Sequence, residues 1–574
     1  MPLVKLQVVS PVLTFSFREM KKPVIAIGLD AAEPSVIEKW MSQGHLQTMR
    51  RLRDQGTYGR LKNFEAFSAE TPWTTFLTGC SPEKTGFWSF LGFREGTYDF
   101  YTKAAYDYNE YSPFYALGED YRVAVFDMPQ ARLCDKVNGL QVLAWGAHSP
   151  QVDSGSLPTS LFQELVDKHG EHPGLHNDYS VCLDLKATLR LQKILETGIA
   201  RRATICQDLL QRESWDLFLT VFGEAHSMGH NFWQLSQPEH PLYEDLSPRV
   251  SGDPMLEGFQ AIDRAIGKIL AKAPKDAHVV IFSAHGMGPN TMDVPSTTFL
   301  AEFLYRHSFP GKFALANGGE LGTPLEPIMS KMKWNYWERH LWGTKYDPNP
   351  IRRFLRRETP TKLFELIEPW LDSSKETDLI SPFRLTKETD VVPYQPASWY
   401  MPLWPKMKAF ALPSFAEGYI RINLQGREPQ GLVPPSEYDA LCDELIQKLY
   451  ALKDARKGVP MIKDIIKTRK SASDRNPKLS DPDLVVVWQD EYATDVVESP
   501  DVGRIGPVPH YRAGSHRSEG FIIANGPGIA SGVNFGRGHA LDLAPTILQL
   551  MGAPIPEYFD GKPLPLLAKE LINS

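Results

Sequence analysis

Six short apolar runs are the clearest pattern along the chain. Each holds mostly Val, Ile, Leu, Phe and Ala, and apolar and polar positions do not alternate strictly within it. Strands that are covered by helices on both faces show this pattern. We therefore predict buried parallel strands at 23–31, 121–128, 215–224, 278–286, 483–488 and 520–526.

Stretches with helical spacing of apolar residues separate these runs. The predicted helices lie at 34–56, 159–170, 189–212 and 258–273. Strands that alternate with helices are typical of a doubly wound α/β fold, here a mostly parallel sheet flanked by helices.

The stretch from 291 to 405 interrupts this alternation. It is rich in Pro, Trp and Arg and contains no clear strand, so we interpret it as an inserted cap or lid. A strand pair is predicted within 405–431 and a helix at 436–453. The predicted organisation is an N-terminal extension at 1–22, the first part of the core at 23–290, the cap at 291–405, and the second part of the core at 406–574. Met20 offers a second possible start before the first strand.

Composition limits the kinds of binding partner and the cellular compartment that we expect for this chain. The net charge is -7 over 574 residues, which argues against nucleic acid as a dedicated partner. The five cysteines are scattered, odd in number and without a CxxC pair, which favours a reducing, cytoplasmic setting. We find no run of about 20 apolar residues, so no membrane span is predicted.

Polar residues at the carboxyl ends of the predicted strands are the first candidates for chemistry, because open α/β sheets bind ligands there. They are Asp30, Asp127, Glu224, His226 and His285. A carboxylate such as Asp30 can bind a metal or act as a base. It can equally satisfy the backbone donors at the start of the following helix.

His226 and His230 are spaced so that both imidazoles lie on one face of a helix and can reach one ion. The spacing alone is weak evidence, since the chain has 15 histidines. His172 and His176 share it, but Pro173 lies between them and we interpret that pair as part of a loop.

Two further segments carry candidate groups. His510 and His516 precede the run at 520–526 beside Gly and Arg, where they suit metal ligation, anion contact or a solvated loop. Thr71 precedes Pro72, a pattern typical of a helix start. A hydroxyl there can act as a nucleophile, lie near an anion, or simply cap the helix.

Taken together, these segments resemble the alkaline phosphatase superfamily, in its type I phosphodiesterase/nucleotide pyrophosphatase branch. The resemblance covers 23–290 and 397–566. The motifs, in the family's order, are "GLDAAEP", "TPWTTFLTGCSPEKTG", "VFGEAHSMGH", "FSAHGMG", "KAFALPSFAEGYIRINLQGRE", "GSHRSEGFIIANGPGI" and "DLAPTILQLMGAPIPEYFDGKPL". The resemblance implies two divalent metals, often zinc, and a Thr or Ser nucleophile that cleaves phosphate, phosphonate or sulfate esters.

For the first metal, the resemblance implies an Asp, a His four residues later and a His near the C-terminus. This chain has His226, His230 and His516 at those positions, so the Asp has become a third histidine.

For the second metal, the resemblance implies the Asp of the first strand, the nucleophile and an adjacent Asp-His pair. Here Asp30 and His285 remain as candidate ligands, while Ala284 replaces the Asp of the pair. An ungapped count back from Thr78 places Ala69 at the nucleophile position. Thr71 fits only if the loop is two residues shorter, and Ser68 is one place off.

We therefore expect one divalent metal per chain, zinc before other metals, held by the three histidines rather than two metals. Such an ion generates a metal-bound hydroxide. Asp30, Thr71 and His285 are the predicted catalytic residues, with Asp30 and His285 as candidates for acid–base work. Arg512 and Arg517 are predicted to bind a small anionic substrate.

The predicted function is a metal-dependent hydrolase or group-transfer enzyme for a phosphate, phosphonate or sulfate-type ester. Two alternatives stay open. One is a two-metal phosphodiesterase with Thr71 as the nucleophile and Glu70 or Glu224 as the missing carboxylate. The other is a non-catalytic metal-binding protein of the same fold.

Overall fold

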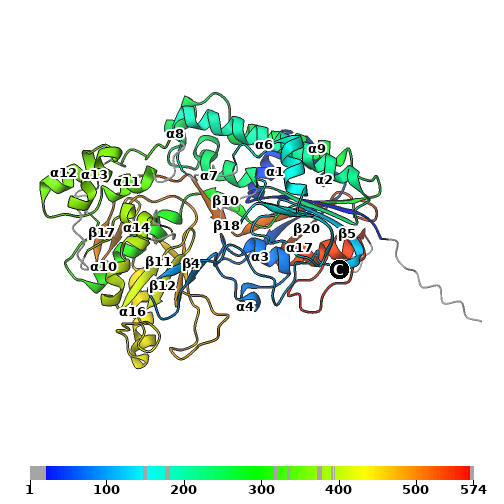
Figure 1. Cartoon of the computed structure of the whole chain (residues 1–574). Helices are drawn as coiled ribbons and strands as arrows, with labels where there is room; N and C mark the ends of the chain where they lie inside the picture. Colours follow the sequence, from blue (N-terminus) through cyan, green and yellow to red (C-terminus); the bar gives the residue numbers. More distant parts are fainter. Residues whose placement is uncertain are drawn as a thin grey trace, which may run out of the picture.

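A computed structural model describes residues 21–568, apart from 147–151, 175–180, 316–320, 322, 332–335, 372–377, 389–391 and 393–394. The predicted N-terminal extension falls almost wholly on residues 1–20, which lie outside the described residues. Figure 1 shows two parts side by side: a large sheet with its helices, and a second part that carries α10 to α16 and smaller sheets.

The large sheet has nine strands in the order β20-β2-β19-β9-β1-β8-β5-β6-β7. The pairs β1–β8, β1–β9, β5–β8, β5–β6 and β2–β20 are parallel, which confirms the predicted doubly wound, mostly parallel α/β sheet. The strands are β1 (Val24–Leu29), β2 (Thr57–Lys62), β5 (Gly118–Phe126), β6 (Val137–Leu143), β7 (Gly155–Leu157), β8 (Leu217–Phe222), β9 (His278–Ser283), β19 (Glu519–Asn525) and β20 (Val533–His539).

Helices cover both faces of this sheet. In Figure 1, α1, α2, α6 and α9 lie on one face and α3 and α17 on the other. Strand β1 shows why its sequence is apolar throughout: Ile25 and Ile27 pack into one core, and Val24 and Ala26 into the other. The helices of this part are α1 (Pro34–Ser42), α2 (Gln47–Asp54), α3 (Pro72–Thr78), α4 (Pro82–Thr85), α5 (Leu161–His169), α6 (Leu185–Arg212), α7 (Glu224–Ser236), α8 (Tyr243–Leu246), α9 (Pro254–Leu270) and α17 (Leu543–Met551).

Two predictions for this part need correction. The single helix predicted at 34–56 is two helices, because Gly44 adopts a left-handed φ of 81° between them and ends the first. The run at 520–526 forms β19, which is antiparallel to both β9 and β2.

The second part is built on a four-stranded antiparallel sheet in the order β11-β12-β15-β14. The predicted pair in 405–431 is confirmed as the antiparallel strands β11 and β12. The run at 483–488 was predicted to be parallel, and this is wrong: it forms β15, antiparallel to β12 and β14. A short apolar run that is buried on both faces has the same composition in either kind of sheet.

The elements of the second part and of the connecting strands are as follows. The strands are β3 (Leu91–Phe93), β4 (Phe100–Thr102), β10 (Gly286–Pro289), β11 (Ala409–Leu412), β12 (Gly418–Ile422), β13 (Lys453–Asp454), β14 (Ile462–Lys467), β15 (Leu484–Trp488), β16 (Val497–Ser499), β17 (Gly503–Ile505) and β18 (Gly514–Arg517). The helices are α10 (Leu300–Ser308), α11 (Tyr336–Trp342), α12 (Pro350–Glu358), α13 (Thr361–Leu371), α14 (Pro382–Glu388), α15 (Pro396–Trp399) and α16 (Tyr438–Tyr450).

The described residues of the predicted cap form the helices α10 to α15 joined by irregular segments, and α16 confirms the helix predicted at 436–453. The strands from β11 to β17 pair among themselves and not with the large sheet, to which the chain returns at β19. The domain boundaries remain a prediction.

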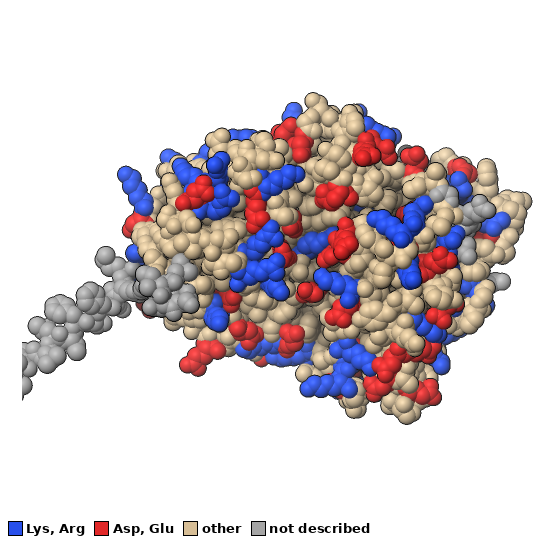
Figure 2. Space-filling model, turned by 180° about the vertical axis from the view of Figure 1, so that it is seen from behind, with Lys and Arg blue, Asp and Glu red and all other residues tan. Residues whose placement is uncertain are grey.

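Charge is mixed over the surface. On the face shown in Figure 2, Lys and Arg are interspersed with Asp and Glu. All five cysteines are free and buried. Among the described residues, no helix is both long enough and apolar enough to cross a membrane.

Candidate metal centre

Helix α7 begins directly after the central strand β8 and presents His226 and His230 on one side, one turn apart. Both are buried, at 3% and 2% exposure, and their ring centroids lie 4.4 Å apart. The helical pairing predicted from their spacing is thus present at the carboxyl end of a buried parallel strand.

The third histidine comes from strand β18, far along the chain. His516 lies with its ring centroid 5.1 Å from that of His226 and 4.9 Å from that of His230. The close approach of β18 to α7 requires glycine, because a Cβ on Gly514 would lie 2.2 Å from the carbonyl oxygen of Gly229. The potential ligand atoms of the three histidines all lie within 4.8 Å of one another.

One distance between these nitrogens suits two ligands of a tetrahedral ion. Nε2 of His230 lies 3.3 Å from Nε2 of His516. Two nitrogen ligands at the usual distance from a tetrahedral zinc lie roughly 3.3 Å apart. Nδ1 of His230 lies 2.8 Å from the carbonyl oxygen of Gly514. A proton on Nδ1 then leaves the lone pair of Nε2 for a metal, which is the usual arrangement around ligating histidines.

Asp30 and His285 lie beside this group, as predicted. Asp30 directly follows β1, is buried, and accepts a hydrogen bond of 3.1 Å from the indole of Trp73. Nε2 of His285 lies 3.7 Å from Oδ1 of Asp30, and the ring centroid of His285 lies 5.1 Å from that of His516. One acid and four histidines therefore converge at the carboxyl ends of β1, β8 and β9.

The position next to His285 carries no ligand. The side chain of Ala284 is buried in the apolar core, and its carbonyl oxygen accepts a hydrogen bond from the Asn63 amide. Among the described residues, the three histidines form the only group of three or more His, Cys, Asp or Glu ligand atoms this close together.

Neither carboxylate considered as a substitute for the missing acid joins the three histidines. Both oxygens of Glu224 accept hydrogen bonds from Arg202 at 3.1 Å, and His172 lies 3.2 Å from one of them. Glu70 is buried and accepts a hydrogen bond of 3.3 Å from the hydroxyl of Tyr419. Burial and the nearby carboxyl of Glu417 raise the pKa of Glu70.

Thr71 is the N-cap residue of α3, with Pro72 at the first helical position, as its sequence predicted. Its hydroxyl does not bond to the helix N-terminus, however. It donates to the carbonyl oxygen of Phe67 at 2.9 Å. A catalytic role for Thr71 remains a prediction.

The two predicted anion-binding arginines differ in their partners. Nε of Arg512 lies 2.9 Å from a carboxylate oxygen of Asp293, so its charge is offset within the protein. Arg517 donates instead to the carbonyl oxygen of Pro289 at 2.6 Å and to the hydroxyl of Thr291 at 3.0 Å. Burial lowers the pKa of Arg517. Among the described residues no carboxylate lies within ion-pair distance of Arg517, which leaves it better suited to a substrate anion.

The remaining candidate histidines lie elsewhere. The ring of His510 lies 6.5 Å from that of His240 and outside the three-histidine group. His172 is in a loop, as predicted, and His176 lies outside the described residues.

The loop residue His172 belongs to a buried ionic cluster that the sequence did not reveal. Arg202 in α6 contacts Asp127 at 2.7 Å and Glu224 at 3.1 Å, and all three side chains are fully buried. The sequence identifies Asp127 and Glu224 as acids at strand ends, but no local pattern identifies Arg202 as their partner. Because Glu224 is the first residue of α7, the cluster fixes the start of the helix that carries His226.

The sequence model of the family described as type I phosphodiesterase/nucleotide pyrophosphatase matches residues 24–336. No curated protein matches the chain.

Solved structures with a similar fold include phosphonoacetate hydrolase from Sinorhizobium meliloti 1021 in complex with phosphonoformate. It is 12% identical, with a TM-score of 0.46, and the match covers 93% of this chain and 96% of that one. Murine ectonucleotide pyrophosphatase/phosphodiesterase 5 is 10% identical, with a TM-score of 0.44 and the same coverage of both chains.

Proposed function

Because the chain belongs to the type I phosphodiesterase/nucleotide pyrophosphatase family, we propose that it hydrolyses a phosphoester or phosphonoester with one divalent metal held by three histidines. Family membership makes it a metal-dependent phosphoester hydrolase. That this site holds a single metal is our proposal and goes beyond what family membership shows. The observation that carries it is the convergence of His226, His230 and His516 within 4.8 Å, beside a second ligand set in which Ala284 supplies no ligand.

The donor set suits zinc before other divalent metals. Imidazole nitrogens are good zinc ligands, and three of them with an open fourth position match catalytic rather than structural zinc sites. When bound, such an ion polarises a phosphoryl oxygen and acidifies a water molecule.

The other residues of the site orient the substrate and handle protons. In this proposal Asp30 and His285 exchange a proton with the attacking or the leaving oxygen, and their separation of 3.7 Å supports a shared role. Arg517 orients the anionic ester, and its bonds to a backbone carbonyl and a hydroxyl support this role.

The first test is the metal content of the purified protein, measured by elemental mass spectrometry and normalised to protein concentration. We expect one zinc-like divalent ion per chain. Two tightly bound ions per chain would contradict the single-metal proposal and favour the two-metal phosphodiesterase.

A second test concerns Thr71. If the nucleophile is water, Thr71→Ala should keep kcat/KM within about tenfold of the wild type, because only the hydrogen bond to Phe67 is lost. Thr71→Ser, which keeps a hydroxyl, serves as the matched control. A loss of about a thousandfold in Thr71→Ala alone would identify Thr71 as the nucleophile.

A further inference from the structure

A pocket of about 320 Å³ lies next to the metal centre, between the large sheet and the β14–β15 side of the second part. It adjoins the centre through Met287, which pairs with His516 across the β10–β18 ribbon, and through Arg517, the residue after His516. Its position beyond the carboxyl ends of β1 and β9 is where α/β sheets bind substrates. A substrate whose phosphoryl group lies at the three histidines therefore extends its organic group into this pocket.

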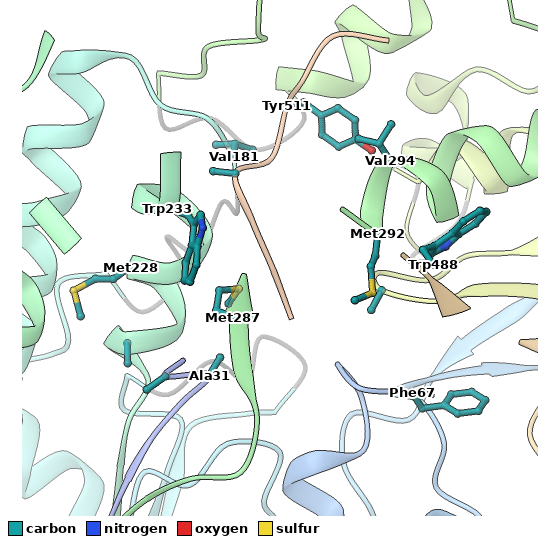
Figure 3. Close-up of a cluster of buried hydrophobic side chains, with 14 of the residues drawn as sticks. Ala31, Phe67, Val181, Met228, Trp233, Met287, Met292, Val294, Trp488 and Tyr511 are labelled. Atoms are coloured by element: carbon teal, nitrogen blue, oxygen red, sulfur yellow. The ribbon is translucent and has the colours of Figure 1, made fainter. Parts of the chain in front are cut away.

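One part of the pocket wall is apolar. Trp233 and Met287 line the side of the large sheet, and Met292 and Trp488 line the opposite side, as Figure 3 shows. These four side chains are at most 6% exposed, so they form a fixed wall rather than a mobile one. Such a surface favours alkyl or aromatic carbon over a strongly hydrated group.

The charged part of the wall is predominantly acidic. Five carboxylates line the pocket against two basic side chains. The acids are Glu33, Glu65, Glu239, Asp490 and Glu519, and the bases are Lys463 and Arg517.

The only lysine of this wall is already engaged: Lys463 lies 3.3 Å from Asp490 and 3.9 Å from Glu65. Arg517 is held by its bonds to Pro289 and Thr291, and its charge also acts on Glu33 and Glu239, although among the described residues it forms no ion pair with either. The five carboxylates of the wall therefore still outnumber its two bases.

One further observation indicates a missing partner. Oε2 of Glu33 is buried and accepts no hydrogen bond from any described residue, although Oε1 is bonded to Ser35. A buried acceptor of this kind favours a ligand that brings a donor or a positive charge.

We propose that this pocket binds the organic group of the substrate and that this group carries a positive charge, as an alkylammonium does. The inference rests on the proposed function. Carboxylates beside tryptophan and methionine side chains suit an ammonium ion with attached methyl or methylene groups. The same wall disfavours a second anionic group, such as a further phosphate, through like-charge repulsion.

The test compares two chromogenic diesters of equal size with the zinc-loaded full chain. One is p-nitrophenyl phosphorylcholine. The other is p-nitrophenyl 3,3-dimethylbutyl phosphate, in which a neutral tert-butyl group replaces the trimethylammonium group. We expect kcat/KM to be at least about tenfold higher for the choline ester, which corresponds to roughly 1.4 kcal/mol.

Variants of two pocket residues test whether the preference for the choline ester arises in the pocket. Glu239→Gln and Glu33→Gln keep the shape of each side chain and should each reduce the preference severalfold, most of it in KM. The matched control Glu244→Gln alters an exposed acid of α8 outside the pocket and should leave the ratio unchanged. Equal hydrolysis of both esters, or a ratio that the pocket variants do not change, would overturn the inference while leaving the proposed function intact.

A binding measurement separates the two proposals. Calorimetry with phosphocholine and with 3,3-dimethylbutyl phosphate needs no turnover. Tighter binding of phosphocholine without hydrolysis of either ester supports the pocket and contradicts the proposed function. Equal affinity for the two compounds overturns the pocket assignment, whatever the activity.

Discussion

Replacing His226 with alanine is expected to remove the metal and to lower kcat/KM about a thousandfold. His226 is one of three imidazoles whose ligand atoms lie within 4.8 Å, and its loss leaves two ligands, too few to hold a divalent ion tightly. Loss of the ion removes a stabilisation of several kcal/mol of transition-state charge, and about 4 kcal/mol corresponds to a thousandfold in rate. Elemental mass spectrometry and steady-state kinetics on the same preparation measure both effects.

The informative control is His226→Asp, which restores the residue that the family resemblance implies at this position. An aspartate can still ligate, so this variant should retain one metal per chain and part of the activity. If the alanine variant keeps both its metal and its turnover, the three histidines are a buried aromatic cluster and not a metal site.

Motifs in the sequence sufficed to identify the family, which the match over residues 24–336 confirms. They also placed His226, His230, His285 and Asp30 together, because residues that follow neighbouring parallel strands meet at one edge of a sheet. Only the family resemblance assigned His516 to the same group, since no local pattern in the sequence places β18 against α7.

The direction of β15 and β19 was beyond sequence reasoning for a physical reason. Both strands are buried on two faces, and burial determines composition while pairing direction depends on neighbours elsewhere in the chain. The break between α1 and α2 is different: Gly44 was a visible signal, and continuous apolar periodicity outweighed it in the prediction.

The ligand changes around the centre form a consistent set in terms of charge. The family resemblance implies an aspartate at the position of His226 and another at the position of Ala284. This site therefore carries two fewer negative charges than the implied ligand set. Asp30 remains, and it is bonded to the indole of Trp73. A single dication with neutral imidazole ligands requires less negative charge nearby than two dications do, so the two substitutions are consistent with the proposed one-metal site.

Replacing Arg202 with methionine should have the largest effect on stability. Arg202 is fully buried and bonds to Asp127 at 2.7 Å and to both oxygens of Glu224 at 3.1 Å. Although burial opposes it, Arg202 lowers the pKa of the Glu224 carboxyl. Without the guanidinium, two buried carboxylates face each other with no full positive charge to offset them. Removing one partner of such a cluster costs about 3–5 kcal/mol of unfolding free energy.

Chemical denaturation followed by fluorescence measures this loss, with Arg201→Met as the matched control. Arg201 is the neighbouring residue on α6, and among the described residues it donates only to the carbonyl oxygen of Glu171, at 2.6 Å near the surface. The triple variant Arg202→Met, Asp127→Asn, Glu224→Gln removes the unpaired charges and should recover part of the stability. The loss of unfolding free energy in Arg202→Met arises from buried carboxylates that have lost their positive partner. If Arg202→Met unfolds at the same denaturant concentration as Arg201→Met, the cluster does not hold α7. The position of His226 would then have to depend on the packing of α7 against its neighbouring elements, among them α9, β18 and β10.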